Sequence, residues 1–213
     1  MITDKEHKRH FKQFHKLSDR HILAAETDMS SSDIQKVVKL SNKIRKAGNE
    51  LVGLMRKNFD QLMRTKRYRK LLKLYGSTED KKKRKYLAGQ LNEMQKQYDV
   101  TWDFCRKSMI FIGKKYNVDA VFALTKAEDI WRGMEKCLYG NGNILHFSKY
   151  GDLPCIRAKQ MNRGIPIFVK DNKLQFKLGR TVFGIKINDR FQTDEVNAVL
   201  DYLAEPEIMN NKA

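Results

Sequence analysis

The chain has 213 residues, of which 41% are hydrophobic and 32% are charged, so it can bury one good core or two small ones beneath an unusually polar surface. Lys and Arg number 43 against 25 Asp and Glu, which gives a formal net charge of +18. This imbalance argues against a generic cytosolic enzyme and indicates a polyanionic partner, with nucleic acid favoured over an anionic membrane.

The N-terminal segment is strongly basic. Residues 1–20 are rich in Lys, Arg and His, and we interpret them as either a basic helix or an arm that orders only on its partner. Four histidines lie within the first 21 residues, but no set of carboxylates or cysteines completes a metal site around them. With a short strand expected from His21 to Glu26, residues 1–30 are predicted to be a basic arm with a short strand.

The next segment, residues 31–140, is predicted to be a helical domain. Ser31 and Ser32 are candidate N-caps for a long helix from about Asp33, in which apolar residues recur every three or four positions as far as Leu62. Gly76-Ser-Thr is interpreted as a turn between two helices.

Two more helices are expected after this turn. One apolar stripe runs from Leu87 to Ile112, which predicts a second long helix ending near Gly113. A third helix is expected to begin at a capping box formed by Thr125 and Glu128, and to stop before Gly140. Together the helices predict a short antiparallel bundle.

A run of cations between Arg64 and Arg84 is the first candidate binding site. Most of the excess charge lies in residues 1–150, where 33 Lys and Arg face 17 Asp and Glu. Two tyrosines lie within the run, a combination that holds phosphates while stacking on unpaired bases or sugars. The alternative is a solvated helix face, but like charges three and four residues apart cost helix stability, which favours a binding role. The candidates are Arg64, Lys66, Arg67, Tyr68, Arg69, Lys70, Tyr75, Lys81, Lys82, Lys83 and Arg84.

Residues 141–213 are predicted to form a β-rich module with a C-terminal helix. Short strands are expected over Ile144–Lys149, Ile165–Lys170 and Leu174–Leu178, with a further strand from Thr181, and a turn at Asp171-Asn172 joins the second and third strands. A final helix is expected from about Thr193 to Ala204. The predicted fold class is therefore α+β, an antiparallel helical bundle followed by a small β-barrel-like or curled-sheet module.

A second candidate site lies in this module. Its polar residues flank Gly151 and Gly164, so they are expected on strand edges and turns where a nucleic-acid backbone can approach closely, although the glycines are equally explained by the turns themselves. The candidates are Lys149, Arg157, Lys159, Asn162 and Arg163.

The sequence carries no sign of catalysis or of a membrane segment. Common nucleotide-binding, serine-hydrolase and zinc-hydrolase motifs are missing from it, and the carboxylates needed for two-metal phosphodiester chemistry are not gathered at strand ends. The three cysteines are widely spaced and are interpreted as buried apolar fillers. It contains no run of 18 apolar residues and no signal peptide. We therefore expect a cytoplasmic protein without enzymatic activity, cofactor, metal or membrane contact.

The segment Glu135 to Ile167 resembles the region before the nuclease domain in TnpB-family proteins, the transposon-encoded relatives of type V CRISPR effectors. In that family a phrase like Leu-Phe-Gly-Lys-Gly leads to Lys-x-Asn-x-x-Gly-Ile. Leu40 to Leu51 resembles the first recognition helix of the family, Arg67-Tyr-Arg-Lys-Leu follows at a similar distance, and Trp131 to Ile167 resembles the turn into its wedge domain. The resemblance covers about residues 34–190.

The resemblance implies a recognition half that does not cut. In the family, recognition and wedge domains hold a structured guide RNA and the guide–target DNA duplex, while a following RuvC-like domain cleaves. The present chain ends at Ala213, where that domain would be expected. The implied function is a non-catalytic subunit of an RNA-guided system in the cytoplasm of a bacterial or phage-infected cell, with a second chain supplying the RuvC-like nuclease. The alternative is a free-standing RNA- or DNA-binding regulator or inhibitor without a nuclease partner.

Overall fold

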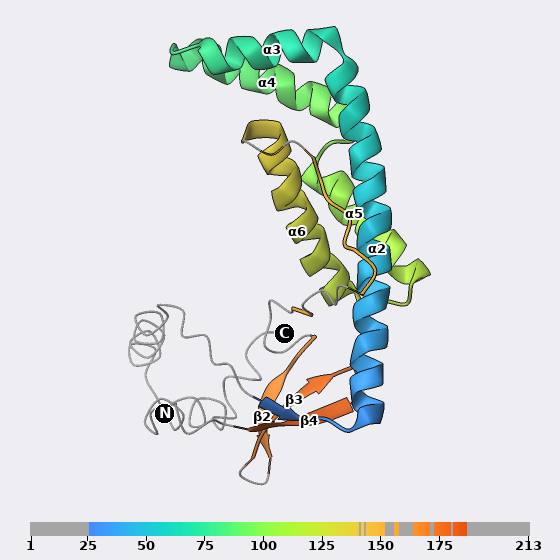
Figure 1. Cartoon of the computed structure of the whole chain (residues 1–213). Coiled ribbons are helices and arrows are strands. Elements are labelled where there is room, and N and C mark those ends of the chain that lie inside the picture. The colour runs from blue at the N-terminus through green and yellow to red at the C-terminus, as the bar shows by residue number, and fades with distance from the viewer. Residues whose placement is uncertain are drawn as a thin grey trace, which may run out of the picture.

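The computed structural model describes residues 26–140, 142, 144–151, 156–157, 164–170, 173–179 and 181–186. The protein is α+β, as predicted: a helical region is followed in the chain by a small antiparallel sheet (Figure 1). The described elements are β1 (Glu26–Asp28), α2 (Ser31–Arg64), α3 (Lys66–Ser77), α4 (Lys81–Gln97), α5 (Trp102–Lys115), α6 (Ala120–Tyr139), β2 (Ile167–Lys170), β3 (Lys173–Leu178) and β4 (Thr181–Lys186).

Helix α2 is the spine of the molecule and has 34 residues. Its N-cap is Ser30, whose hydroxyl accepts a hydrogen bond from the Asp33 amide (3.2 Å), so the helix begins slightly earlier than predicted. Gly48 does not interrupt it. A β-carbon at this position would lie 2.7 Å from Lys126 Cε, so the glycine allows the Lys126 side chain of α6 to cross α2 closely.

The predicted second long helix is wrong, because two helices occupy this stretch. Helix α4 ends at Gln97, and α5 begins after the N-cap Thr101, whose hydroxyl accepts from the Phe104 amide (3.2 Å). Asp99 adopts a left-handed conformation at the break (φ 56°). Val100 is completely buried there, so the apolar stripe continues across the break and conceals it in the sequence.

The predicted start of the third helix is also wrong. Helix α6 begins after Asp119, whose carboxylate accepts from the Val121 amide (2.8 Å). Thr125 lies inside the helix and donates its hydroxyl hydrogen to the Val121 carbonyl (2.9 Å), so it makes no capping box. The end of α6 at Tyr139, before Gly140, is confirmed.

Residues Ile144–Lys149 do not form the predicted strand. They belong to an extended segment, residues 144–151, that descends along α2 and is called the strap below (Figure 1). Leu145 is buried, and the Asn49 side chain of α2 pairs with both backbone groups of Ser148, each at 2.9 Å. These contacts with helices use the backbone groups that a neighbouring strand would need.

The sheet has the strand order β1-β4-β3-β2, and every neighbouring pair is antiparallel. Strands β2, β3 and β4 confirm the three strands predicted after residue 164. Of the strand predicted over residues 21–26, only Glu26 lies in the described part of the chain, where it begins β1. Phe176 and Phe183 stack between β3 and β4, with ring centroids 4.9 Å apart. The sheet is open rather than closed in the described ranges. The predicted turn at 171–172 and helix at 193–204 lie outside them.

The core lies mainly between α2, α5 and α6. Leu51, Met55, Cys105, Met109 and Met134 are fully buried there. Cys105 is therefore the apolar filler predicted, and burial raises its pKa to about 12; Cys137 is half-buried and Cys155 lies outside the described residues. Among the helices that the structure describes, none combines the length and apolar character needed to cross a bilayer.

Candidate nucleic-acid interface

Helices α3 and α4 form an antiparallel pair that projects sideways from the end of α2 (Figure 1). Together with Arg64 and the turn between them, they are called the basic hairpin, residues 64–97. This segment holds 12 Lys and Arg against 3 Asp and Glu, a net charge of +9. Half of the formal charge of the chain is thus carried by 34 residues.

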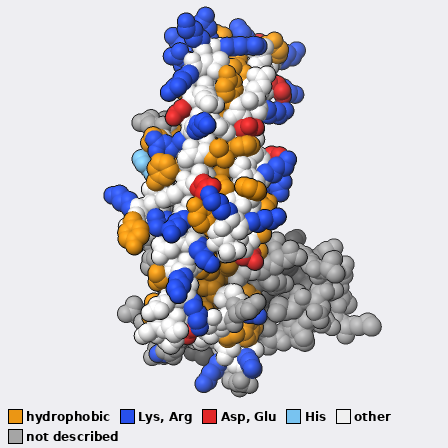
Figure 2. Space-filling view, turned by 90° about the vertical axis from the view of Figure 1, so that its right-hand side faces the viewer, with side chains coloured by type: hydrophobic (Ala, Val, Ile, Leu, Met, Phe, Trp, Pro, Cys, Tyr) orange, Lys and Arg blue, Asp and Glu red, His pale blue; other side chains and the backbone are white. Residues whose placement is uncertain are grey.

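The cations of the basic hairpin lie on its surface. Figure 2 shows Lys and Arg side chains gathered at the upper end of the molecule, over α3 and α4. All nine predicted cations, from Arg64 to Arg84, are exposed, as are Lys73 and Lys85. In the described part of the chain, none of these eleven side chains forms a salt bridge with an acidic residue. The surface is therefore an uncompensated positive patch.

The start of α4 concentrates this charge most strongly. Five consecutive cations, Lys81 to Lys85, follow the N-cap Asp80, whose carboxylate accepts from the amides of Lys82 (2.8 Å) and Lys83 (3.4 Å). The N-terminus of a helix carries a partial positive charge, so cations there are unfavourable and an external anion is favoured. Lys85 is absent from the predicted set, although it directly continues the same run.

Tyr68 is a correction, because it lies in the core and not on the binding surface. It is fully buried, and its hydroxyl accepts a hydrogen bond from Gln95 Nε2 (3.0 Å). Burial raises the pKa of Tyr68. Tyr75 is half-buried, and the Arg84 guanidinium lies 4.8 Å from the centroid of its ring, so this tyrosine fixes an arginine across the hairpin.

A polar network holds the base of the basic hairpin. Gln95 is buried and donates to Tyr68 of α3, while its Oε1 accepts from the Tyr139 hydroxyl of α6 (2.8 Å). Nearby, Thr65 donates to the Tyr98 hydroxyl (3.0 Å). These bonds connect α3 and α4 to each other and to α6, so they fix how the cations are presented.

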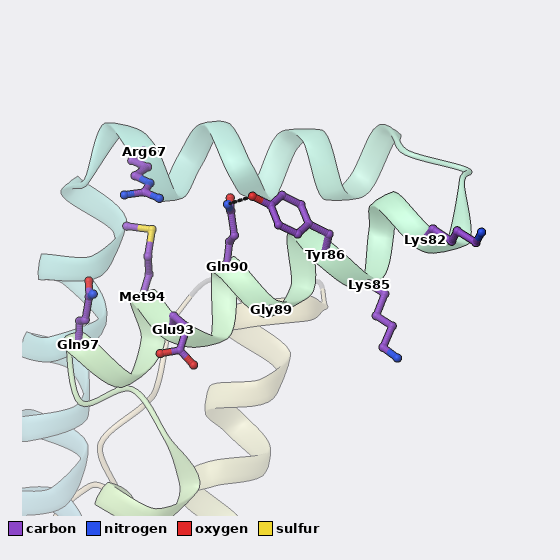
Figure 3. A pocket seen from close by; sticks show the side chains of 9 residues that line it. All are labelled: Arg67, Lys82, Lys85, Tyr86, Gly89, Gln90, Glu93, Met94 and Gln97. Carbon is purple, nitrogen blue, oxygen red and sulfur yellow. Dashed lines mark hydrogen bonds between the residues drawn. The ribbon is translucent and has the colours of Figure 1, made fainter.

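A shallow groove of about 730 Å³ follows the hairpin (Figure 3). In this view Arg67 points from α3 toward α4. Tyr86 extends from α4 toward Gln90, and its hydroxyl accepts a hydrogen bond from Gln90 Nε2 (2.7 Å). Gly89 leaves the middle of the groove without a side chain. Tyr86 is 65% exposed and is the aromatic residue that sequence reasoning missed; its position directly after the Lys81 to Lys85 run was the available signal.

The second candidate site is described only in part. Lys149 is exposed on the strap, and Arg157 pairs through its guanidinium with Asp129 of α6. The charge of Arg157 is therefore partly compensated, unlike the charges of the eleven exposed cations described above. Lys159, Asn162 and Arg163 lie outside the described residues, as do the four histidines near the N-terminus. Within the described ranges, no group of three His, Cys, Asp or Glu side chains gathers as a metal site would require.

Comparisons of the chain with protein-family models, with curated proteins and with solved structures find no match. The resemblance to the TnpB family therefore stays a prediction that rests on the quoted residues. The structural feature that bears on function is the set of exposed cations on the basic hairpin.

Proposed function

We propose that this protein binds nucleic acid, without catalysing its cleavage, through the basic hairpin. The observation that carries the proposal is the exposure of eleven cations on α3, α4 and the end of α2, with no salt bridge to an acidic residue in the described part of the chain. Such an array costs folding free energy through mutual repulsion. A polyanion removes that cost and releases its own condensed counterions on binding.

The shape of the hairpin favours a nucleic-acid backbone over a membrane surface. A helix that lies on a membrane presents an apolar face to the lipid. In the hairpin, Leu71, Leu87 and Leu91 are buried inside it and against the bundle. Its exposed large apolar side chains are Leu74 and Tyr86, which do not make a continuous apolar face. Helix α4 has 17 residues and is therefore about 26 Å long. A rod of this length with cations on its surface can follow several consecutive phosphates.

The finer form of the proposal is a role in an RNA-guided system. On this view the ligand is a structured guide RNA together with target DNA, and a second chain supplies a RuvC-like nuclease. The support is the resemblance of Leu40 to Leu51, Arg67 to Leu71 and Glu135 to Ile167 to the recognition and wedge regions of the TnpB family. A free-standing regulator or inhibitor would use the same surface without the second chain.

Purification of the chain from its own host without nuclease treatment tests the proposal. The bound RNA and DNA are sequenced, and the proteins that co-purify are identified by mass. A discrete structured RNA with a RuvC-containing chain supports the guided subunit, and discrete RNA alone supports the free-standing regulator. Purification free of nucleic acid, together with no binding to added RNA or DNA at low salt, would overturn the proposed function.

A further inference from the structure

The strap places two exposed aromatic rings against the long helix α2. Within the strap, Leu145 is buried, and Asn49 of α2 fixes Ser148 through two hydrogen bonds of 2.9 Å. These two anchors leave Phe147 and Tyr150 on the outside, with 48% and 92% of their side chains exposed. Both rings are therefore accessible to a ligand at the surface of the strap.

Each of the two rings is paired with an arginine of α2. The Arg56 guanidinium carbon lies 5.1 Å from the centroid of Phe147, and that of Arg45 lies 5.4 Å from the centroid of Tyr150. Both distances are within the range of cation–π attraction. Arg45 is itself buried and donates to Asn42 Oδ1 (3.4 Å), so it is a fixed support for the ring above it.

Phe147 also forms one wall of a hollow of about 440 Å³ on α2. Arg56, Lys57 and Arg64 contribute three cations to the same hollow, and Asp60 contributes one carboxylate, so the charge of its lining stays positive. Gly53 lies under the ring, where an added β-carbon would be 3.9 Å from Phe147 Cε1. Arg64 belongs to the basic hairpin as well. The hollow therefore connects the hairpin to the strap along one side of α2.

From these contacts we infer that the strap is a second binding site, which takes an unpaired segment of nucleic acid. Two bases stack on Phe147 and Tyr150, and the phosphates beside them lie against Arg56, Lys57 and Arg64. Stacking on aromatic side chains beside a positively charged groove is how single strands are held without sequence preference. The inference rests on the proposed function in that both require a nucleic-acid ligand.

The chemistry of the strap favours an unpaired strand over a duplex or a protein partner. A duplex hides the faces of its bases in its own stack, so exposed rings have nothing to stack on. The polar residues Ser148 and Lys149 separate the two rings, so the strap lacks the continuous apolar patch that marks many protein-binding surfaces. The cations in the hollow also match a polyanion.

Fluorescence anisotropy with two labelled RNAs tests this site, using the full chain. One RNA is an unstructured oligonucleotide and the other is a blunt duplex of the same length. The double variant Phe147→Leu with Tyr150→Leu keeps apolar volume but removes both aromatic rings. Phe111→Leu is the matched control, because Phe111 is a 76% exposed aromatic on α5 with no arginine or lysine over its ring among the described contacts.

We expect the double variant to bind the unpaired RNA at least about 25-fold more weakly, since each of the two lost stacks weakens binding by about fivefold or more. Duplex affinity changes less than about twofold, and the slope of log affinity against log salt stays the same because no cation is removed. Tyr150→Phe retains the affinity of the unchanged protein. The control variant binds both RNAs as the unchanged protein does.

Cross-linking with iodouridine-substituted unpaired RNA provides a readout that does not depend on a variant. Cross-links to Phe147 or Tyr150, located by mass spectrometry, support the site. Cross-links confined to the basic hairpin, or equal losses for both RNAs in the double variant, would overturn the strap site and leave the proposed function standing. No binding of either RNA, or of DNA, by the unchanged protein at low salt would overturn both.

Discussion

Gln95 holds the base of the basic hairpin by both ends of its amide. It donates to the buried Tyr68 hydroxyl and accepts from the Tyr139 hydroxyl, at 3.0 and 2.8 Å. We expect Gln95→Ala to lower the free energy of unfolding by about 1–3 kcal/mol, because it leaves a buried hydroxyl without its partner. Urea unfolding measures this change.

The exposed Gln97 on the same helix is the matched control for that variant. Gln97→Ala is expected to change stability by no more than about 0.5 kcal/mol, as for surface positions in general. Equal losses in the two variants would mean that the network at the base of the hairpin contributes no more than an exposed amide does.

Glu50 joins α2 to α5 by accepting from Lys115 Nζ (2.8 Å) and the Tyr116 hydroxyl (2.8 Å). Two hydrogen bonds lower the pKa of Glu50 below its ordinary value of 4.5, and the bond from Lys115 has a larger effect than the bond from Tyr116. Because the pKa is lower in the folded state, the ionised Glu50 carboxylate stabilises the fold at pH values above the pKa of the unfolded state. This stabilisation is lost as pH falls through the pKa of the folded state.

The interaction of Glu50 with Lys115 and Tyr116 is tested by the pH dependence of the stability difference between the unchanged protein and Glu50→Gln. The unchanged protein should be more stable than Glu50→Gln at neutral pH, and the difference should shrink below pH 4.5 and be lost as pH falls through the lowered pKa of the folded state. Asp60→Asn is the control, because this exposed carboxylate of the same helix makes no salt bridge in the described part of the chain. A difference for Glu50→Gln that persists at acid pH would show that charge is not its origin.

The tyrosines of the hairpin show how far the sequence alone predicts which side chains are exposed. Tyr68 and Tyr75 were both expected to stack on bases, yet Tyr68 is fully buried and Tyr86, which was overlooked, is largely exposed. The sequence of a basic run predicts correctly that its cations are exposed, because cations are not buried without partners. It does not tell which tyrosine faces the core, since a tyrosine can satisfy either environment.

The buried leucines of the two hairpin helices stabilise them, whereas their exposed cations destabilise them. Leu71, Leu87 and Leu91 are buried, whereas five consecutive cations occupy the positive end of α4. Each unfavourable cation there costs about 0.3–1 kcal/mol at low ionic strength, and salt screens the cost. The hairpin is therefore expected to be more stable at higher salt.

Replacing Lys81, Lys83 and Lys85 by Gln should raise the melting temperature at low salt and weaken its salt dependence. Lys96→Gln is the control at the other end of the same helix, where Lys96 pairs with Glu93 (2.8 Å) and a cation is favourable. It should leave stability unchanged or slightly reduced. A triple variant that is less stable than the unchanged protein at low salt would contradict the repulsion described for α4.

At the scale of elements, the predictions failed for two physical reasons: a continuous apolar stripe in one place and a long-range contact in another. The break between α4 and α5 is invisible to periodicity because Val100 continues the buried stripe. The expected strand at Ile144–Lys149 has the composition of a strand, but its backbone at Ser148 is paired with Asn49, which lies 99 residues earlier. The end of α6 was predictable because Gly140 is a local stop signal.

The whole molecule is arranged along α2, which has 34 residues and is therefore about 51 Å long. The sheet lies near its first residues, the strap along its middle and the basic hairpin at its last residues (Figure 1). Strand β1 precedes α2 and pairs with β4, so the sheet joins segments from both ends of the described chain. The α+β class could be predicted from local patterns, whereas this pairing required the fold.

The most direct measurement of the central claim is the salt dependence of RNA binding. If the basic hairpin neutralises about six phosphates, log affinity should fall with log salt at a slope of about −4. Arg67→Ala with Arg69→Ala and Lys70→Ala should reduce that slope to about −2, because three contacts are lost.

The control removes the same charge elsewhere, through Lys170→Ala, Lys173→Ala and Lys177→Ala in the exposed sheet positions of β2 and β3. The hairpin account predicts an unchanged slope for this control and a reduced slope for the hairpin variant. An equal reduction in both variants, or none in the hairpin variant, would contradict it, because binding would then follow net charge or another surface.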